Sequence, residues 1–207
     1  MKLLLENWRD YINENKVKPK LRVFDFDDTI AKSDSKIYIT TDNGKEIIMT
    51  PEDYATHKVN PEYEYDFSEF DEVINPREIK QITNIIRNVL NAGTEEREIA
   101  ILTARDKNAE EPIRKYLEEI GLDTSKITFV LLGDSDPHAK SSWIYDRIVA
   151  GANDVLFFDD SGKNVDAVEQ LKTVEAFSKL IDADKLKIKA RKVKYAKDLV
   201  ENSAGQN

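Results

Sequence analysis

Three aspartates stand within four residues where an apolar run ends, early in the chain. Asp25, Asp27 and Asp28 close the run that begins at Leu21. A carboxylate can serve as a nucleophile, as a general acid or base, or as a ligand for a hard cation. Alternation along a strand would turn Asp25 and Asp27 to one face and Asp28 to the other. We therefore predict chemical roles for the first two, a local capping or pairing role for Asp28, and a turn fixed by a hydrogen bond from Thr29.

Polar side chains also follow the later apolar runs of the chain. They are Thr103 and Arg105 after Ile99–Leu102, Lys140 after Ile127–Leu132, and Asp159 and Asp160 after Val155–Phe158. In an open parallel sheet the carboxyl ends of the strands share one edge, and ligands bind beyond it. We therefore expect these groups to converge on the aspartates.

Carboxylates gathered at one edge repel each other. Two of them about 4 Å apart repel by roughly 4 kcal/mol at an effective dielectric constant near 20. A divalent cation would relieve this repulsion, and a chain without cysteine offers oxygen ligands that suit Mg²⁺ better than Zn²⁺. A single aspartate after a strand, such as Asp134, is often a helix N-cap instead. The convergent set as a whole predicts a Mg²⁺ site.

The elements that must position these residues alternate along the chain. Short apolar runs, including a fifth at Val174–Phe177, are separated by helix-like stretches near 76–91, 108–120, 140–150 and 163–171. Strands that are apolar on both faces are typical of a parallel sheet covered by helices. We predict an α/β fold, a doubly wound Rossmann-like parallel sheet of about five strands.

The segment 32–75 interrupts this alternation after the first strand. Lys36–Thr40 and Glu46–Thr50 flank a turn signal and predict a hairpin, and 51–75 predicts a short helix followed by an irregular acidic piece. We interpret 32–75 as a small hairpin-and-cap insertion. The predicted organisation is an amphipathic helix in 1–20, one catalytic domain over 21–200 that contains the insertion, and a polar tail at 201–207.

Composition limits the class of protein. The chain has 207 residues, a net charge of −9 and no cysteine, which excludes disulfides, thiolate metal sites and a cysteine nucleophile. No apolar run approaches the length of a membrane span, and Leu3–Leu5 is too short for the apolar region of a signal peptide. We therefore expect a cytoplasmic protein without a membrane partner.

The polar residues, taken in order, resemble the motifs of the haloacid-dehalogenase-like (HAD) phosphohydrolase superfamily. DFDDT at 25–29 matches its DxDxT signature, and LTAR at 102–105 is similar to its second motif. Lys140 stands where the third-motif lysine belongs, and FDDSGKN at 158–164 resembles the acidic fourth motif. The likeness spans 23–164, and the small cap together with these motifs looks like phage-encoded HAD proteins related to polynucleotide end-repair phosphatases, for which the compartment would be the host cytoplasm.

The resemblance implies hydrolysis of a phosphomonoester, with Mg²⁺, through an aspartyl-phosphate. Asp25 would be the nucleophile and Asp27 the general acid and base. Mg²⁺ would be bound by the Asp25 carboxylate, the Asp27 carbonyl and Asp160, with Asp159 reaching it through water.

The remaining motif residues would bind the phosphorylated substrate. Thr103 and Ala104 would contact the phosphoryl group, and Lys140 would balance the charge on the phosphorylated nucleophile. Arg105 has two interpretations, a clamp on the substrate phosphate or a surface pair with a nearby acid such as Asp106. His138, alone in a polar loop, is expected to be solvated.

The charge pattern leaves the substrate open. Residues 179–197 hold eight Lys or Arg against two Asp, a pattern typical of a phosphate-backbone contact or of a solvated edge strand or helix. Residues 52–72 hold eight Asp or Glu and one Lys, which would repel a long polyanion. We predict activity on nucleic-acid ends or nucleotides. The alternatives are a small-metabolite phosphatase, for example for sugar phosphates, and a non-catalytic scaffold with the HAD fold.

Overall fold

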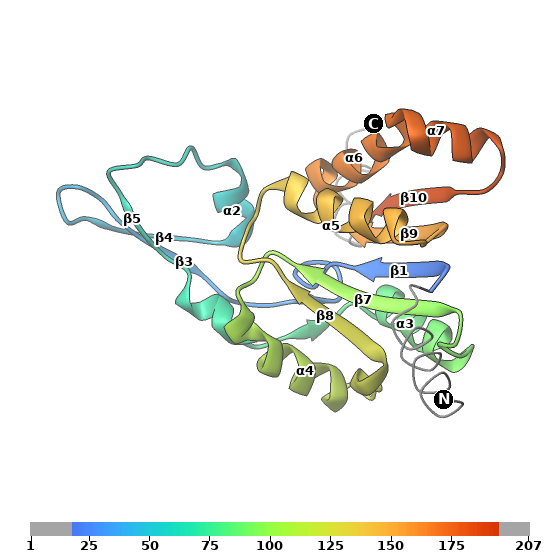
Figure 1. The fold of residues 1–207 in the computed structure, drawn as a ribbon. Helices are drawn as coiled ribbons and strands as arrows, with labels where there is room; N and C mark the ends of the chain where they lie inside the picture. The colour runs from blue at the N-terminus through green and yellow to red at the C-terminus, as the bar shows by residue number, and fades with distance from the viewer. Residues whose placement is uncertain (1–17, 195–207) are drawn as a thin grey trace, which may run out of the picture.

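A five-stranded parallel sheet is the centre of the computed structural model, which describes residues 18–194 (Figure 1). The spatial order is β10-β9-β1-β7-β8, where β1 is Lys20–Phe24, β7 Arg97–Thr103, β8 Ile127–Leu131, β9 Asp154–Asp159 and β10 Lys187–Lys192. The first strand, β1, lies at the centre of the sheet. The next two strands, β7 and β8, follow on one side of β1, and the chain then crosses to the other side, where β9 and β10 lie. This is a doubly wound, Rossmann-like order, and it confirms the predicted α/β class.

Helices cover both faces of this sheet (Figure 1). One face packs against α3 (Lys80–Asn91) and α4 (Glu110–Glu119), and the other against α5 (Pro137–Val149), α6 (Gly162–Gln170) and α7 (Glu175–Asp182). Alternate residues of β1 supply the two cores, since Val23 packs with the α5–α7 side and Phe24 with the α3–α4 side. Short 3₁₀ helices lie at Lys107–Ala109, Thr124–Lys126 and Leu171–Thr173. The core therefore holds β1 rigidly from both sides.

The fifth strand is not where the sequence predicted it. Val174 and Phe177 belong to the start of α7, in which Phe177 is buried and Ile181, one turn later, packs beside it. The strand is β10, inside the basic segment 179–197, and its pattern alternates exposed lysines with the buried Ile188. The prediction failed because an edge strand buries one residue in two and carries charge on the others, so β10 lacks the continuous apolar run that marks the other strands of the sheet.

The insertion after β1 is a small sheet of its own. β3 (Ile37–Thr40) and β4 (Glu46–Met49) form the predicted hairpin, and β5 (Glu64–Asp66) adds a third strand that the sequence did not predict. The short helix α2 (Pro51–Thr56) follows the hairpin, and a 3₁₀ turn occupies Ser68–Asp71. At its base, β2 (Ala31–Lys32) pairs with β6 (Arg77–Glu78), so the chain leaves and re-enters the main domain at one place.

Two predicted segments lie outside the described residues. These are the N-terminal helix, as far as residue 17, and the tail at 201–207. Among the helices of residues 18–194, none combines the length and the apolar character that a bilayer crossing requires.

Candidate active site

The carboxyl ends of β1 and β9 bring three aspartates together. Asp25 follows β1, Asp159 is the last residue of β9, and Asp160 follows it. Parallel pairing continues past Phe24, since the Asp25 N–H donates to the carbonyl of Phe158 at 2.9 Å. One carboxylate oxygen from each aspartate lies within 4.8 Å of the others. The cluster lies between β1 and β9, where the strand order switches from one side of β1 to the other. Ligands usually bind at this switch point in doubly wound folds.

Lys140 reaches into this cluster from the first turn of α5. Its Nζ donates to Asp25 Oδ1 at 2.6 Å and to Asp159 Oδ2 at 2.8 Å, and only 4% of the residue is exposed. Asp136 caps the helix by accepting from the His138 N–H, and Pro137 begins it, which fixes where the lysine starts. The exposed His138 side chain agrees with its predicted solvation.

Asp159 is fully occupied by hydrogen bonds. Besides Lys140, its carboxylate accepts from the Ser161 N–H at 2.8 Å and from Asn164 Nδ2 at 3.0 and 2.9 Å. Asp160 is only half-buried and lies beside it. Of the pair, Asp160 is therefore better placed to bind a cation directly. The role of Asn164 was not predicted from the sequence. It depends on where α6 begins, at Gly162, because this start brings the Asn164 amide to the Asp159 carboxylate at the end of β9.

The electrostatics of the cluster are unbalanced. Three carboxylates, Asp25, Asp159 and Asp160, surround one ammonium, so two negative charges would lack compensation if all three were ionised. Burial raises the pKa of Asp25 well above its ordinary value, and the charges of Asp159, Asp160 and Asp27 add to this against Lys140. Burial and the charge of Asp159 raise the pKa of Asp160 to about 7. A divalent cation would supply the positive charge that the three carboxylates lack.

The residues at this edge fit Mg²⁺. The donors are carboxylate oxygens, which hard cations prefer, and the chain has no thiol. Asp25 and Asp160 would be the carboxylate ligands. The Asp27 carbonyl is a possible third, because the bridge between Asp27 and Ala31 uses the Phe26 and Ala31 carbonyls and leaves it out of the pairing.

The raised pKa of Asp160 gives a prediction for metal-free protein. The unfolded chain ionises Asp160 near pH 4 and the folded chain near pH 7, so this residue costs stability increasingly as the pH rises between these values. Asp160→Asn should therefore stabilise the protein in EDTA by about 1–3 kcal/mol at pH 8 and by almost nothing at pH 4. Urea unfolding of both proteins across this range measures the difference.

Mg²⁺ supplies the control for that measurement. Saturating Mg²⁺ should raise the Tm of the wild type by about 3 °C or more at pH 7.5, and Asp160→Asn should lose most of that shift. Asp182→Asn, an exposed change in α7, should leave both the pH dependence and the Mg²⁺ shift unaltered. An equal gain for Asp160→Asn at pH 4 and pH 8 would mean that the buried charge of Asp160 is not what costs stability.

Arg105 binds Asp27, which neither interpretation of the sequence proposed. Its Nε and Nη2 donate to the two Asp27 carboxylate oxygens at 2.9 and 2.8 Å, a bidentate pair across 78 positions of sequence. Only 4% of Arg105 is exposed, so a surface pair with Asp106 is wrong. In this conformation the fork that would clamp a substrate phosphate is turned onto Asp27.

The same guanidinium ties the insertion to the sheet edge. Nη1 donates to the carbonyls of Phe70 and Glu72 at 2.8 and 2.5 Å, and Nη2 donates to Ser33 Oγ at 3.3 Å. The ring of Phe70 lies 5.1 Å from the guanidinium carbon. Arg105 therefore sets the direction of Asp27 and the position of the insertion together.

The other motif residues lie at the same edge. Thr103 ends β7, is 1% exposed, and accepts at Oγ1 from the Arg105 N–H at 3.3 Å, and the half-buried Ala104 stands between them. Asp28 has a φ of 54°, which takes the chain out of the strand, and its charge adds to the raised pKa of Asp160. It therefore lies toward the cluster, although strand alternation predicted the opposite.

The turn after the aspartates is fixed by backbone bonds. The Ile30 and Ala31 N–H groups both donate to the Phe26 carbonyl, at 2.9 and 3.1 Å. The predicted hydrogen bond from Thr29 is wrong, since its buried hydroxyl has no partner within residues 18–194.

Comparison with known proteins adds no information about this site. The chain matches no family model, no curated protein and no solved structure. Function is therefore inferred from the chemistry of this edge and from the motifs that occupy it.

Proposed function

We propose that the protein is a Mg²⁺-dependent phosphomonoester hydrolase that works through an aspartyl-phosphate. The observation that supports this most is the buried Asp25 at the end of the central strand, with Lys140 on one of its oxygens. Lys140 holds Oδ1, so Oδ2 is the oxygen that would attack. The resemblance of the four motifs to the HAD superfamily points to the same chemistry.

In the first step, Asp25 forms a bond to phosphorus. The bond between phosphorus and the ester oxygen breaks, and its electron pair stays on the leaving alcohol. Asp27 would give the alcohol oxygen a proton, and to carry that proton the Asp27 carboxyl must first release one of its two bonds from Arg105. Lys140 stays beside Asp25 and balances the charge that accumulates there. When bound, Mg²⁺ would neutralise charge on the phosphoryl oxygens and help to hold the ester in line for attack.

In the second step, the aspartyl-phosphate is hydrolysed. The Asp27 carboxylate takes a proton from water, the water oxygen bonds to phosphorus, and the bond from phosphorus to Asp25 breaks. Inorganic phosphate leaves, Asp25 is again a carboxylate, and Asp27 is again protonated. The Thr103 hydroxyl, at the end of the neighbouring strand, is the group that would hydrogen-bond a phosphoryl oxygen.

The direct test is phosphate release from p-nitrophenyl phosphate with and without Mg²⁺. We expect turnover that requires Mg²⁺ and that EDTA abolishes. If no phosphate is released between pH 5 and pH 8 with Mg²⁺ present, the enzyme assignment fails and the scaffold alternative takes its place.

Arg105→Lys tests whether Arg105 positions Asp27 for proton transfer. Lysine keeps the charge but cannot make the bidentate pair. Because a poor leaving group needs the proton more, kcat/KM for an alkyl phosphate should fall about 10–100-fold, and that for p-nitrophenyl phosphate several-fold less. Arg97→Lys is the matched control, since Arg97 also donates to two carbonyls but lies away from the edge. Equal losses on both substrates would indicate a structural role for Arg105 alone.

The substrate predicted from sequence, nucleic-acid ends or nucleotides, stays a prediction. Strand β10 carries exposed lysines at the sheet edge, and the insertion beside the site is strongly acidic. A panel of 3′- and 5′-phosphorylated oligonucleotides, nucleotides and sugar phosphates separates these substrate classes.

A further inference from the structure

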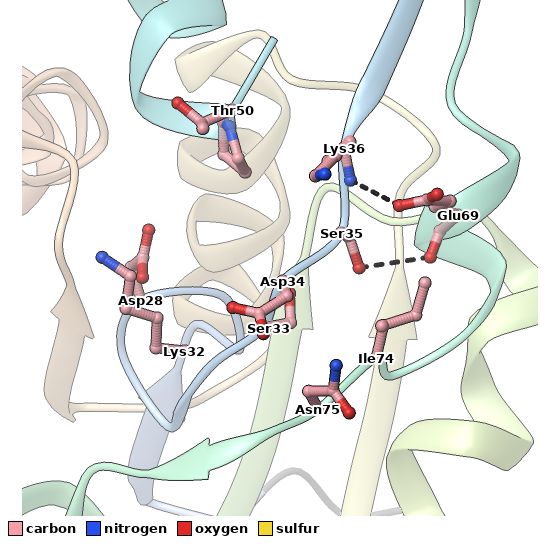
Figure 2. Close-up of a pocket in the computed structure, with 11 residues that line it drawn as sticks. Asp28, Lys32, Ser33, Asp34, Ser35, Lys36, Thr50, Glu69, Ile74 and Asn75 are labelled. Carbon is pink, nitrogen blue, oxygen red and sulfur yellow. Dashed lines mark hydrogen bonds between the residues drawn. The ribbon is translucent and has the colours of Figure 1, made fainter. Parts of the chain in front are cut away.

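A pocket of about 450 Å³ lies where the insertion leaves and re-enters the main domain, lined by residues of 28–36 and of 50–75. Figure 2 shows Asp28 and Lys32 on one side, Lys36 and Glu69 on the other, and Thr50 above. Its size suits a ligand such as a monosaccharide, within the usual range of small-molecule sites.

This pocket is joined to the candidate catalytic residues by two of its own lining residues. Asp28, which lines the pocket, directly follows Asp27 in the chain. Ser33 also lines the pocket, and its hydroxyl accepts from Arg105, which holds Asp27. The pocket therefore lies close to Asp27, the residue that would protonate the leaving group.

The lining offers both hydrogen-bond donors and acceptors, and some of them are bonded to one another or to neighbouring residues. The Glu69 carboxylate accepts from the Lys36 N–H at 2.8 Å and from the Tyr38 hydroxyl at 2.5 Å, and the Ser35 hydroxyl donates to the Glu69 carbonyl at 3.2 Å. Arg77 holds Asp34 in a bidentate pair. A carboxylate has about four acceptor sites, so Glu69 and Asp34 each keep capacity for a ligand.

The same lining disfavours other kinds of leaving group. None of the 11 lining residues drawn in Figure 2 is aromatic, so a nucleobase would find no ring on which to stack. An apolar group would displace water from the charged and hydroxyl side chains of the lining without offering them hydrogen bonds in return. Three carboxylates against two lysines make the pocket unfavourable for a polyanion.

Hydroxyl groups satisfy this lining best, because each one both donates and accepts. We propose that the pocket receives the hydroxyl-rich alcohol portion of a sugar or polyol phosphomonoester, which departs as the leaving group. The inference rests on the proposed phosphatase activity and narrows its substrate class to small polyhydroxylated esters. Lys36 and Asn75 would donate to the hydroxyls of the alcohol, and Glu69 would accept from them.

The experiment compares substrates and one pocket variant. With Mg²⁺, kcat/KM for a hexose 6-phosphate should exceed that for a 5′-phosphorylated oligonucleotide at least 10-fold. Lys36→Met should lower kcat/KM for the hexose phosphate at least 10-fold more than it lowers that for p-nitrophenyl phosphate. Lys45→Met, in the exposed turn of the same hairpin and outside the pocket, should change neither value.

Binding without turnover separates the two proposals. Asp25→Asn protein should bind the hexose phosphate in a calorimeter, and adding Lys36→Met should weaken the Kd at least 5-fold. Such binding without any hydrolysis of p-nitrophenyl phosphate would overturn the phosphatase and keep the pocket. Hydrolysis of p-nitrophenyl phosphate with a preference for the oligonucleotide, or with no effect of Lys36→Met on the hexose phosphate, would overturn the pocket assignment alone.

Discussion

Asp25→Asn is expected to lower Mg²⁺-dependent phosphate release by about 10⁴-fold or more, to the limit of detection. The amide has the shape of the carboxylate but is not a nucleophile, so no aspartyl-phosphate can form. The fold should persist, because Lys140 keeps Asp159 as a partner at 2.8 Å. The measurement is inorganic phosphate released from p-nitrophenyl phosphate, with thermal unfolding to show that the variant is folded.

A trapped intermediate distinguishes a nucleophile from a residue that only binds metal. Acid quenching during turnover should leave the mass of one phosphoryl group on the peptide that contains Asp25 in the wild type, and none in the variant. Asp182→Asn, on the exposed side of α7, should retain full activity and the adduct. If Asp25→Asn keeps more than about a tenth of the activity, another group is the nucleophile and the mechanism is wrong.

The candidate site was predictable to the extent that it follows strand ends. Asp25 and Asp159 each close an apolar run, and parallel strands bring such ends to one edge whatever the loops do. Lys140 joins them from the first turn of the helix after β8, so its position also follows from the alternation of elements. These contacts needed only the fold class and the order of the elements.

The pair between Arg105 and Asp27 was not predictable in this way. Acids next to Arg105 in the sequence were equally good partners on charge alone, and only the depth of Arg105 under the insertion excludes them. Its bonds to Phe70 and Glu72 depend on the 3₁₀ turn at Ser68–Asp71, which no pattern of apolar residues predicts. When burial decides which charged side chains pair, the pair can be identified only from the three-dimensional structure.

Strands that are short or lie at an edge were missed for a related reason. β5 has only three residues, Glu64–Asp66, two of them acidic, and it forms because β3 offers it a free edge. Four of the six residues of β10 are Lys or Arg, all of them exposed, and only Ile188 is buried. In both strands the backbone pairing, rather than the burial of apolar side chains, decides the conformation.

Lys140→Met should produce the largest loss of stability, about 3–5 kcal/mol in EDTA at pH 7.5. Burial lowers the pKa of Lys140, but Asp25 and Asp159 outweigh burial and hold it above its ordinary value, so the ammonium is charged in the folded protein. Removing it leaves two buried carboxylates without their shared partner. Urea unfolding measures the cost, and Lys179→Met, at an exposed pair on α7, should cost less than about 0.5 kcal/mol.

The pH dependence and a double mutant identify the cause of that loss. Burial already raises the pKa of Asp25, and without Lys140 this pKa should rise further, so the penalty should be largest at the highest pH and shrink as the pH falls and Asp25 takes up a proton. In an Asp25→Asn background, Lys140→Met should cost at least about 1 kcal/mol less than in the wild type, because one of the two carboxylates is gone. Mg²⁺ should recover part of the loss in the single variant, since the cation supplies the missing positive charge. A penalty that is the same at every pH and in both backgrounds would show that Lys140 stabilises the fold by packing, and that the cluster does not need a cation to hold its carboxylates together.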